Sequence, residues 1–312
     1  MKIALISRFD YCGSGYRMAQ AIGMNTNHHV QYFRLVHDDM SFGRPQPLFN
    51  VTGDKMGINE GVMGEVNALL KDVDILHFKG DEPPIEKYFP LIDKSKPKVI
   101  SVSGSFFRRG KSRVAQPLEP IEAYLSCTDK RTSLMADLNY PEFDAQFVPH
   151  PVVDTEYTWK PRKKPLIVHA PTSKRKKGTD VFLEAVKNFD VDVEVIYGQP
   201  HSVALEAISR ATIFFDQCRQ ESYGNATIES MARGIPTLTQ LSDKSIEWSG
   251  GLLDASPIVN TGSTVESLSR AIEEMLNKDL KVVSKKTKSF CDRTHGYENV
   301  AQMWDKIYKG MV

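Results

Sequence analysis

Short runs of apolar, largely β-branched residues alternate along this chain with segments in which apolar residues recur every three or four positions. The short runs predict β-strands, and the second pattern predicts amphipathic helices. In the first half of the chain, strands are expected at residues 2–7, 30–36, 74–78, 98–102, 123–126 and 146–148. In the second half, strands are expected at residues 166–169, 193–197, 212–215, 235–239 and 258–259.

Helices are predicted between these strands, at residues 14–22, 61–71, 179–188, 202–210, 227–233 and 265–277. Regular alternation of strand and helix produces parallel sheets with right-handed crossovers. The expected fold class is therefore α/β, with two doubly wound, Rossmann-like parallel-sheet domains. Ligands of such sheets bind at the carboxyl ends of the strands, so we expect the functional site in a cleft that the two domains face.

A basic, proline-containing stretch at residues 160–165 separates the two series of strands. We therefore expect a first domain at residues 1–155 and a second domain at residues 156–294. The segment that follows, residues 297–310, has an apolar helical face made of Val300, Trp304, Ile307 and Tyr308. Such a face packs on a core surface, and we expect residues 295–312 to form a helix that returns to the first domain.

Composition places the chain among ordinary globular proteins. Its 312 residues are 41% hydrophobic, and the formal net charge is +1, which argues against a protein that coats nucleic acid along its whole surface. The charge is uneven, however. Residues 158–178 contain eight basic residues and no acidic one, and residues 108–113 are also basic and free of acids. Local positive fields of this kind concentrate anions.

Targeting and redox features are sparse. The four cysteines are widely spaced and form no CxxC pair, so neither a disulfide framework nor a zinc site is expected. No stretch approaches the ~18 consecutive apolar residues of a membrane span. The first strand turns polar at Arg8 and Asp10, too early for a secretory signal. A cytoplasmic protein without a membrane span is expected.

A glycine-containing turn follows the first predicted strand. Gly13, Ser14 and Gly15 lead into a helix, where glycines let backbone amides approach a ligand and the helix amino end favours an anion. A dinucleotide-binding fingerprint would place a third glycine where Met18 stands, so a dehydrogenase fits poorly. A tight turn without any ligand explains the same glycines.

A run of four cations, Lys174 to Lys177, follows the first strand of the second domain. This location puts the run at the ligand edge of the domain, where ammonium groups can hold a diphosphate. The alternative is a solvated charge run, the usual meaning of such a stretch.

The segment at residues 214–237 carries the most information. A strand is followed by a polar loop with Glu221, and Gly224 allows a tight entry into a helix that carries Glu229. Unpaired amides at the start of that helix suit phosphate, and a carboxylate at position 229 can accept hydrogen bonds from both hydroxyls of a ribose. Gly234 and Pro236 end the helix and lead into the next strand.

Taken together, these motifs resemble those of retaining glycosyltransferases of the GT-B fold, the large family 4-like group. The resemblance covers most of the chain. It rests on the Gly13-Ser14-Gly15 turn, on Lys177-Gly178-Thr179-Asp180, and on Glu221 and Glu229 followed by the sequence from Met231 to Pro236. Weaker support comes from residues 148–154, which look like the hinge-proximal segment of the family.

The resemblance implies that the second domain binds a nucleotide sugar, with a UDP-sugar favoured. Glu229 would hold the ribose, and Glu221 would hold a hydroxyl of the transferred sugar. The catalytic group would comprise Glu221 together with Lys177 and Lys174, which stabilise the diphosphate. The remaining donor-binding positions would be Gly13, Ser14, Gly15, Gly224, Asn225 and Ala226. No cofactor or metal is implied, because cations and helix amino ends stabilise the leaving group.

The acceptor would then bind to the first domain. Many relatives carry a His-Gly pair after a first-domain strand, where this chain has Ser103-Gly104. His77 stands at the end of another strand, and with Ser103 it is a candidate for acceptor binding. The alternative for His77 is a structural histidine that only packs. Arg108 and Arg109, with Lys111 and Arg113, favour an anionic acceptor, such as a phosphorylated or envelope glycan or DNA with a hydroxylated base. A solvated loop beside core phenylalanines is the alternative.

Two other functions remain open at this stage. A nucleotide-sugar epimerase or a hydrolase of the same fold would need carboxylates as acid and base, and only Asp10, Asp81 and Glu82 are placed to supply them. A non-catalytic module that binds anions or nucleotides could also retain both glutamates. A retaining glycosyltransferase is the function that the sequence favours, and the resemblance implies that its departing phosphate takes the acceptor proton.

Overall fold

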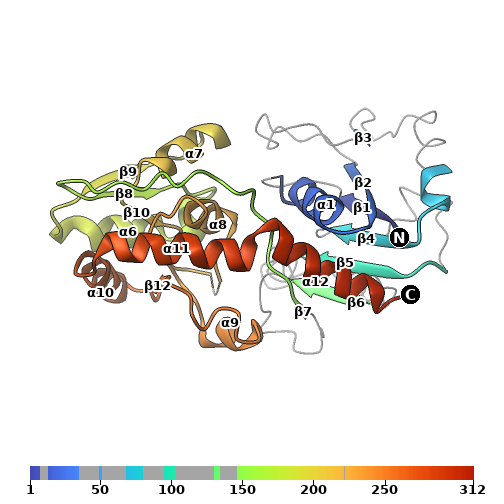
Figure 1. Ribbon diagram of the computed structural model, residues 1–312. Helices are drawn as coiled ribbons and strands as arrows, with labels where there is room; N and C mark the ends of the chain where they lie inside the picture. The colour runs from blue at the N-terminus through green and yellow to red at the C-terminus, as the bar shows by residue number, and fades with distance from the viewer. Residues whose placement is uncertain are drawn as a thin grey trace, which may run out of the picture. The chain divides into compact units, whose positions relative to one another are not determined.

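The computed structural model describes residues 1–7, 13–34, 49–50, 68–79, 95–102, 130–133, 146–220 and 222–312. The chain forms two compact units. Unit 1 comprises Met1–Pro151 and Tyr297–Val312, and unit 2 comprises Val152–Gly296. The chain therefore passes from one unit to the other twice, after residue 151 and after residue 296 (Figure 1).

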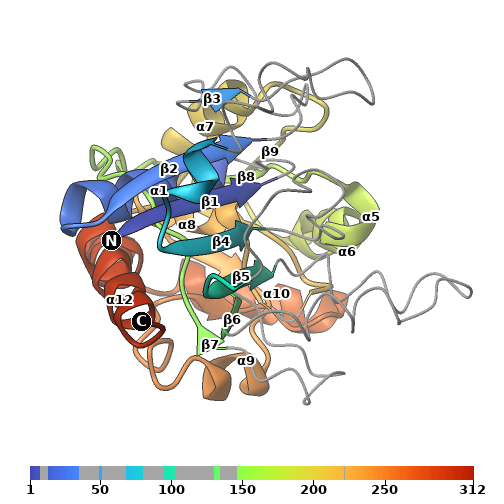
Figure 2. The same ribbon diagram turned by 90° about the vertical axis from the view of Figure 1, so that its right-hand side faces the viewer.

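Unit 1 is built on a seven-stranded parallel sheet in the order β3-β2-β1-β4-β5-β6-β7. Figure 2 shows the strands from β2 to β7 following one another across this sheet. The interior strand β1 is a continuous apolar run because both of its faces are covered, and Ile3, Ala4 and Leu5 have no exposed surface. The strands are β1 (Lys2–Ser7), β2 (His29–Arg34), β3 (Phe49–Asn50), β4 (Ile75–Lys79), β5 (Lys98–Val102), β6 (Lys130–Ser133) and β7 (Gln146–Phe147).

Two helices pack together in unit 1 although they are far apart in sequence. Helix α1 (Ser14–Asn25) lies against α12 (Tyr297–Lys309). The core between them and the sheet contains Leu5, Met18, Trp304 and Tyr308. Trp304 and Tyr308 lie on the apolar face that the sequence predicts for residues 297–310, and both are fully buried.

Unit 2 contains a five-stranded parallel sheet in the order β12-β11-β10-β8-β9. Its strands are β8 (Leu166–His169), β9 (Asp192–Val195), β10 (Ile213–Phe215), β11 (Thr237–Thr239) and β12 (Val259–Asn260). The helices are α5 (Lys174–Lys177), α6 (Thr179–Ala185), α7 (His201–Ser209), α8 (Asn225–Met231), α9 (Asp243–Trp248), α10 (Val265–Leu276) and α11 (Leu280–His295), with a 3₁₀ turn at Val186–Asn188.

The predicted fold class is confirmed, since both units contain parallel sheets joined through helices. Several elements differ from the prediction. The run of cations at 174–177, where no helix was predicted, forms the short helix α5, because Ser173 caps it and Gly178 ends it with a φ of 75°. Strand β6 was not predicted, and the strand predicted at 123–126 lies outside the described residues.

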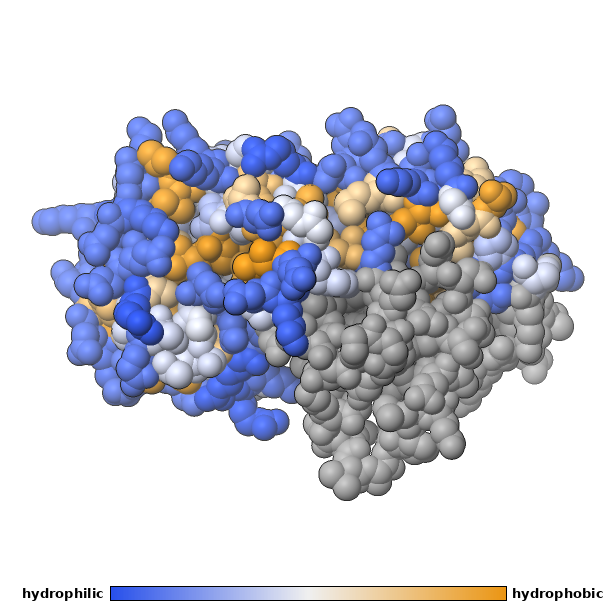
Figure 3. Space-filling view, turned by 90° about the horizontal axis from the view of Figure 1, so that it is seen from below, coloured by the Kyte–Doolittle hydropathy of each residue, from blue (hydrophilic) through white to orange (hydrophobic). Residues whose placement is uncertain are grey.

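Helix α11, the longest helix that the structure describes, was also missed. Its buried positions include Ser284, Thr287, Thr294 and His295 as well as Phe290 and Cys291, so polar residues interrupt the apolar periodicity that identifies a helix in sequence. The exposed side of α11 carries several lysines, and hydrophilic residues predominate on the described part of the face in Figure 3. No helix in the described ranges is long and apolar enough to cross a membrane.

Candidate active site

The predicted donor-binding residues of unit 2 that the structure describes lie at one edge of its sheet. Strands β8, β9 and β10 are parallel, so their carboxyl ends meet at the same edge. The chain leaves β8 and enters α5, leaves β9 and enters α7, and leaves β10 and enters α8. This connectivity brings Lys177, His201 and Glu229 to the edge where ligands of doubly wound sheets bind.

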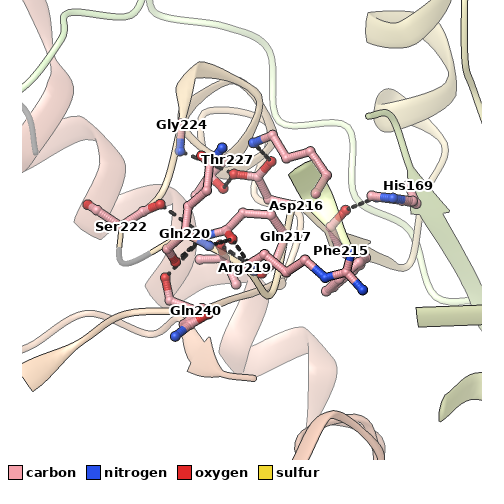
Figure 4. A network of polar contacts seen from close by, with 12 residues as sticks. His169, Phe215, Asp216, Gln217, Arg219, Gln220, Ser222, Gly224, Thr227 and Gln240 are labelled. Carbon is pink, nitrogen blue, oxygen red and sulfur yellow. Dashed lines mark hydrogen bonds and ion pairs between the residues drawn. The ribbon is translucent and has the colours of Figure 1, made fainter. Parts of the chain in front are cut away.

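Asp216 is the polar centre of this edge. It directly follows β10, and its side chain is only 2% exposed. One carboxylate oxygen, Oδ1, accepts a hydrogen bond from Lys177 Nζ at 2.7 Å. The other oxygen, Oδ2, accepts from the Gly224 amide at 3.1 Å and from the Thr227 hydroxyl at 2.9 Å. Figure 4 shows the carboxylate directed toward Gly224 and Thr227.

These contacts decide the charge state of Asp216. Burial raises the pKa of the carboxyl, but the Lys177 ammonium and the hydrogen bonds from Thr227 and Gly224 outweigh burial and lower it below its ordinary value. The edge therefore carries an ion pair, and the ammonium of Lys177 is held next to the start of α8. A Cβ atom added to Gly224 would lie 3.6 Å from Lys177 Nζ, which shows how closely the two positions approach.

The same contacts correct one expectation. The Gly224 amide was expected to bind a phosphate, but it already donates to Asp216. Asn225 and Ala226, the two other positions expected there, form the first turn of α8. The structure thus gives the Gly224 amide a role in supporting the Asp216 carboxylate.

Gln217 organises the loop that leads from β10 to α8. Its side-chain amide donates to the carbonyl oxygens of Gln220 and Ser222, both at 2.9 Å. Its side-chain oxygen accepts from the amides of Arg219 and Gln220 (Figure 4). Glu221 itself lies outside the described residues. Its two neighbours in sequence are therefore fixed by a glutamine that has no exposed surface.

Glu229, the residue expected to hold a ribose, is paired with a histidine. His201 begins α7, and its Nε2 lies 2.9 Å from Glu229 Oε2. The two side chains are 11% and 5% exposed. The backbone oxygen of Glu229 accepts a hydrogen bond from Arg233 at 2.7 Å, which ties the end of α8 to this position.

Lys174, the second predicted cation, is exposed at the start of α5. Its ammonium lies 4.8 Å from the centroid of the Tyr197 ring, within the range of a cation–π contact. Tyr197 follows β9 and is half exposed. An aromatic ring and a cation therefore stand together on the surface of the same edge.

Unit 1 has a smaller polar group at the carboxyl ends of β1 and β4. Gly13 adopts a φ of 62° and precedes α1 without a side-chain cap. The Ser14 hydroxyl accepts a hydrogen bond from Lys79 Nζ at 2.7 Å. Gly15 lies against the Tyr32 ring so closely that a Cβ atom would come within 2.7 Å of the Tyr32 hydroxyl. Packing therefore explains Gly15, and Lys79 adds a cation beside the predicted turn.

His77, expected as an acceptor-binding residue, has a different environment. It is fully buried, and its ring nitrogens contact the Tyr308 hydroxyl at 2.7 Å and the Ser101 hydroxyl at 2.8 Å. Burial lowers the pKa of His77 to about 3. A side chain with both nitrogens engaged inside the core does not reach a bound acceptor, so we exclude His77 from the site and describe it as a structural histidine.

The other acceptor-binding candidates, Ser103, Arg108 and Arg109, lie outside the described residues, as do Lys111 and Arg113. The same is true of Asp10, Asp81 and Glu82, the carboxylates considered for an epimerase or hydrolase. In the part of the chain that the structure does describe, no three His, Cys, Asp or Glu side chains gather as they would around a metal ion.

Three residues of these edges were missed by sequence reasoning: Asp216, His201 and Lys79. Asp216 and Lys79 each stand where a buried strand ends, at the ligand edge of a parallel sheet. A polar residue at the end of a buried strand could therefore have identified both positions from the sequence. The contact of His201 with Glu229 joins residues 28 positions apart and depends on how α7 packs against α8.

Comparison with solved structures gives the fold a name. An alpha-glucosyltransferase solved with UDP and a 13-mer DNA aligns with a TM-score of 0.67 at 13% identity, over 99% of this chain and 100% of that chain. Sucrose-phosphate synthase from Thermosynechococcus elongatus aligns with a TM-score of 0.65 at 12% identity, over 99% and 98% of the two chains. The chain has the GT-B fold.

The GT-B likeness extends beyond glycosyltransferases. A protein named as a UDP-N-acetylglucosamine 2-epimerase from Listeria monocytogenes aligns with a TM-score of 0.53 at 12% identity, over 99% of this chain and 96% of that chain. No family model matches the sequence, and no curated protein matches it. At these sequence identities, the comparisons establish the fold. The function has to be inferred from the residues of the site.

Proposed function

We propose that the protein is a glycosyltransferase that moves a sugar from a nucleotide sugar to an acceptor hydroxyl. The observation that carries this proposal is the cluster at the carboxyl edge of the unit 2 sheet. There, Lys177 is held beside the start of α8 by Asp216, and Glu229 lies on the same helix. A cation for phosphate and a carboxylate for a sugar diol are the two groups that a nucleotide diphosphate requires.

The proposed chemistry assigns a role to each described group. Lys177 and Lys174 would stabilise the negative charge that develops on the leaving diphosphate. Glu229 would accept hydrogen bonds from the ribose hydroxyls. Lys79 and Ser14 would offer polar groups at the equivalent edge of unit 1. Glu221 would hold a hydroxyl of the transferred sugar, as the sequence resemblance implies.

We further propose a metal-independent reaction that retains the anomeric configuration, with a UDP-sugar as the favoured donor. The family resemblance supports this finer assignment, and lysines would neutralise the diphosphate in the role that a divalent ion has in other transferases. Three similar structures contain UDP: those of the alpha-glucosyltransferase, of HepE from Anabaena and of MnaA from S. aureus. The donor base is the first thing to measure.

For the acceptor, we propose an anionic molecule with a free hydroxyl, either a phosphorylated glycan or DNA with a hydroxylated base. The support is the acid-free basic stretch at residues 108–113 in the predicted acceptor domain. Transfer to a polyanion should weaken as salt rises, because each contact with a phosphate displaces counterions. A rate that does not change with salt would contradict a polyanionic acceptor.

A panel assay tests the reaction class. The protein is incubated with UDP-, GDP-, ADP- and TDP-sugars, with and without glycan and DNA acceptors, and nucleotide release is measured in the presence of EDTA and of magnesium. Release that requires an acceptor indicates transfer, whereas release without an acceptor indicates hydrolysis. Thermal stabilisation by nucleotide without release indicates a binding module. The anomeric configuration of the product, read by NMR, decides retention.

An epimerase is the second candidate, because a protein named as a UDP-N-acetylglucosamine 2-epimerase shares the fold over nearly the whole chain. An epimerase would convert UDP-N-acetylglucosamine into an epimer without any acceptor. The same incubation, followed by NMR of the sugar ring, distinguishes the two reactions. A new epimer in the absence of acceptor would overturn the transferase proposal.

A further inference from the structure

The contact between His201 and Glu229 is the most specific arrangement that the proposed roles do not use. His201 is the first residue of the nine-residue helix α7, and Glu229 lies within α8. The two helices come from different crossovers of the sheet, and the side chains meet with Nε2 and Oε2 2.9 Å apart. Neither residue belongs to the apolar clusters that form the unit 2 core.

The hydrogen bond between His201 and Glu229 needs one donor and one acceptor. When the Glu229 carboxylate is ionised it only accepts hydrogen bonds, and the contact then requires a proton on Nε2 of His201. A donor fixed on Oε2 restricts rotation of the carboxylate about its last torsion, which is otherwise broad. The plane in which the Glu229 oxygens accept further hydrogen bonds is therefore set by His201.

A second histidine at the same edge gives a contrast. His169 ends β8 and is fully buried, and its ring nitrogens contact the Phe215 carbonyl at 3.0 Å and the Thr179 hydroxyl at 2.8 Å. Burial lowers the pKa of His169 to about 4, although the Phe215 carbonyl opposes this change. His169 thus links β8 to β10 and α6. His201, in contrast, contacts the one carboxylate that the proposed function assigns to the donor ribose.

We propose that His201 is a positioning residue for nucleoside recognition. By orienting the Glu229 carboxylate, it makes both oxygens fit the 2′- and 3′-hydroxyls of a ribose, and so it sets the preference of the site for ribonucleotides over 2′-deoxyribonucleotides. This inference rests on the proposed function, since it requires that unit 2 binds a nucleotide through Glu229.

The test measures binding of paired nucleotides by titration calorimetry: UDP with dUDP, GDP with dGDP, and ADP with dADP. The wild-type protein should prefer the ribonucleotide of the pair that binds most tightly. His201→Ala should weaken binding of that ribonucleotide by about ten-fold, the effect expected when a hydrogen bond to a charged group is lost. Binding of the deoxynucleotide should change less, so the preference should shrink.

Three further variants make the result specific. His201→Gln should keep most of the preference, because the glutamine amide can donate to Glu229 from a similar position. Ser202→Ala, the next residue of α7, is exposed and should change neither affinity. In a Glu229→Gln background, His201→Ala should leave the preference unchanged, because the effect passes through the carboxylate. Circular dichroism verifies that each variant is folded.

The possible results distinguish a failure of the proposed function from a failure of the role of His201. If the wild-type protein binds none of the nucleotides, the proposed function is overturned and this inference with it. If the wild type prefers the ribonucleotide and His201→Ala keeps the same ratio, only the role of His201 is overturned. If His201→Ala binds the ribonucleotide more tightly, His201 competes with the ribose for Glu229 and the positioning role is wrong.

Discussion

The Lys177–Asp216 ion pair predicts an asymmetry between two single substitutions. Lys177→Met leaves the Asp216 carboxylate, only 2% exposed, without its counter-charge. Breaking a buried ion pair from one side costs about 3–5 kcal/mol of unfolding free energy. Asp216→Asn should cost less, about 1–3 kcal/mol. The reason is that Lys177 is 13% exposed and its flexible stem can turn the ammonium toward water.

The double variant is the decisive comparison. With Met at 177 and Asn at 216, no charge is buried, and the asparagine oxygen can still accept from the Gly224 amide and the Thr227 hydroxyl. Replacing a whole buried pair is often close to neutral, so the loss should be below about 2 kcal/mol. The double variant should therefore be more stable than Lys177→Met alone, although it carries one more substitution.

Differential scanning calorimetry checks this prediction. For a domain of this size, each kcal/mol shifts the melting temperature by about 2–4 °C, so Lys177→Met should lower the transition of unit 2 by roughly 10 °C. The double variant should recover most of that shift. A double variant whose loss equals the sum of the two single losses would refute the reasoning, because it would show that the two charges do not interact.

Three further predictions concern binding, acid stability and backbone conformation. Glu229→Ala should weaken binding of the preferred nucleotide by about 1.5–3 kcal/mol, measured by calorimetry, and an unchanged affinity would remove Glu229 from the site. Because burial lowers the pKa of His77 to about 3, unit 1 should lose stability as the pH falls from about 6.5 toward that value. A flat denaturation midpoint across that range would contradict this prediction, and His77→Gln should reduce the loss. Gly178→Ala should destabilise unit 2 by at least about 1–2 kcal/mol in urea unfolding, since Gly178 has a φ of 75° and faces the Cys218 sulfur. Full stability in this variant would show that the turn can relax.

Strands and helices with an apolar pattern could be predicted from the sequence, and others could not. Strand β8 is a run of buried apolar residues between polar segments, so its bounds were predicted as the structure has them. Helix α11 is different, because serine, threonine and histidine occupy part of its buried face. Polar residues interrupt the apolar pattern of that face, and only tertiary packing shows which side faces the core.

Some residues of the site could likewise be predicted from the sequence, and others could not. Lys177 and Glu229 could be proposed because they stand in local motifs, between a strand and a helix. Their partners could not, since Asp216 lies 39 residues from Lys177 and His201 lies 28 residues from Glu229. Such pairs depend on which strands become neighbours in the sheet. A histidine at the end of a strand was likewise open to two interpretations until its burial was known.

The order of the two units along the chain has a consequence for protein synthesis. Unit 1 begins with the first strand, yet its core includes Trp304 and Tyr308 from α12, which follows all of unit 2. At typical elongation rates, the ribosome needs on the order of 10 s to produce the intervening residues 152–296. During that interval, Leu5 and Met18 lack the part of their core that α12 supplies in the finished protein. The nascent first sheet therefore exposes apolar surface that α12 covers only after unit 2 has been synthesised.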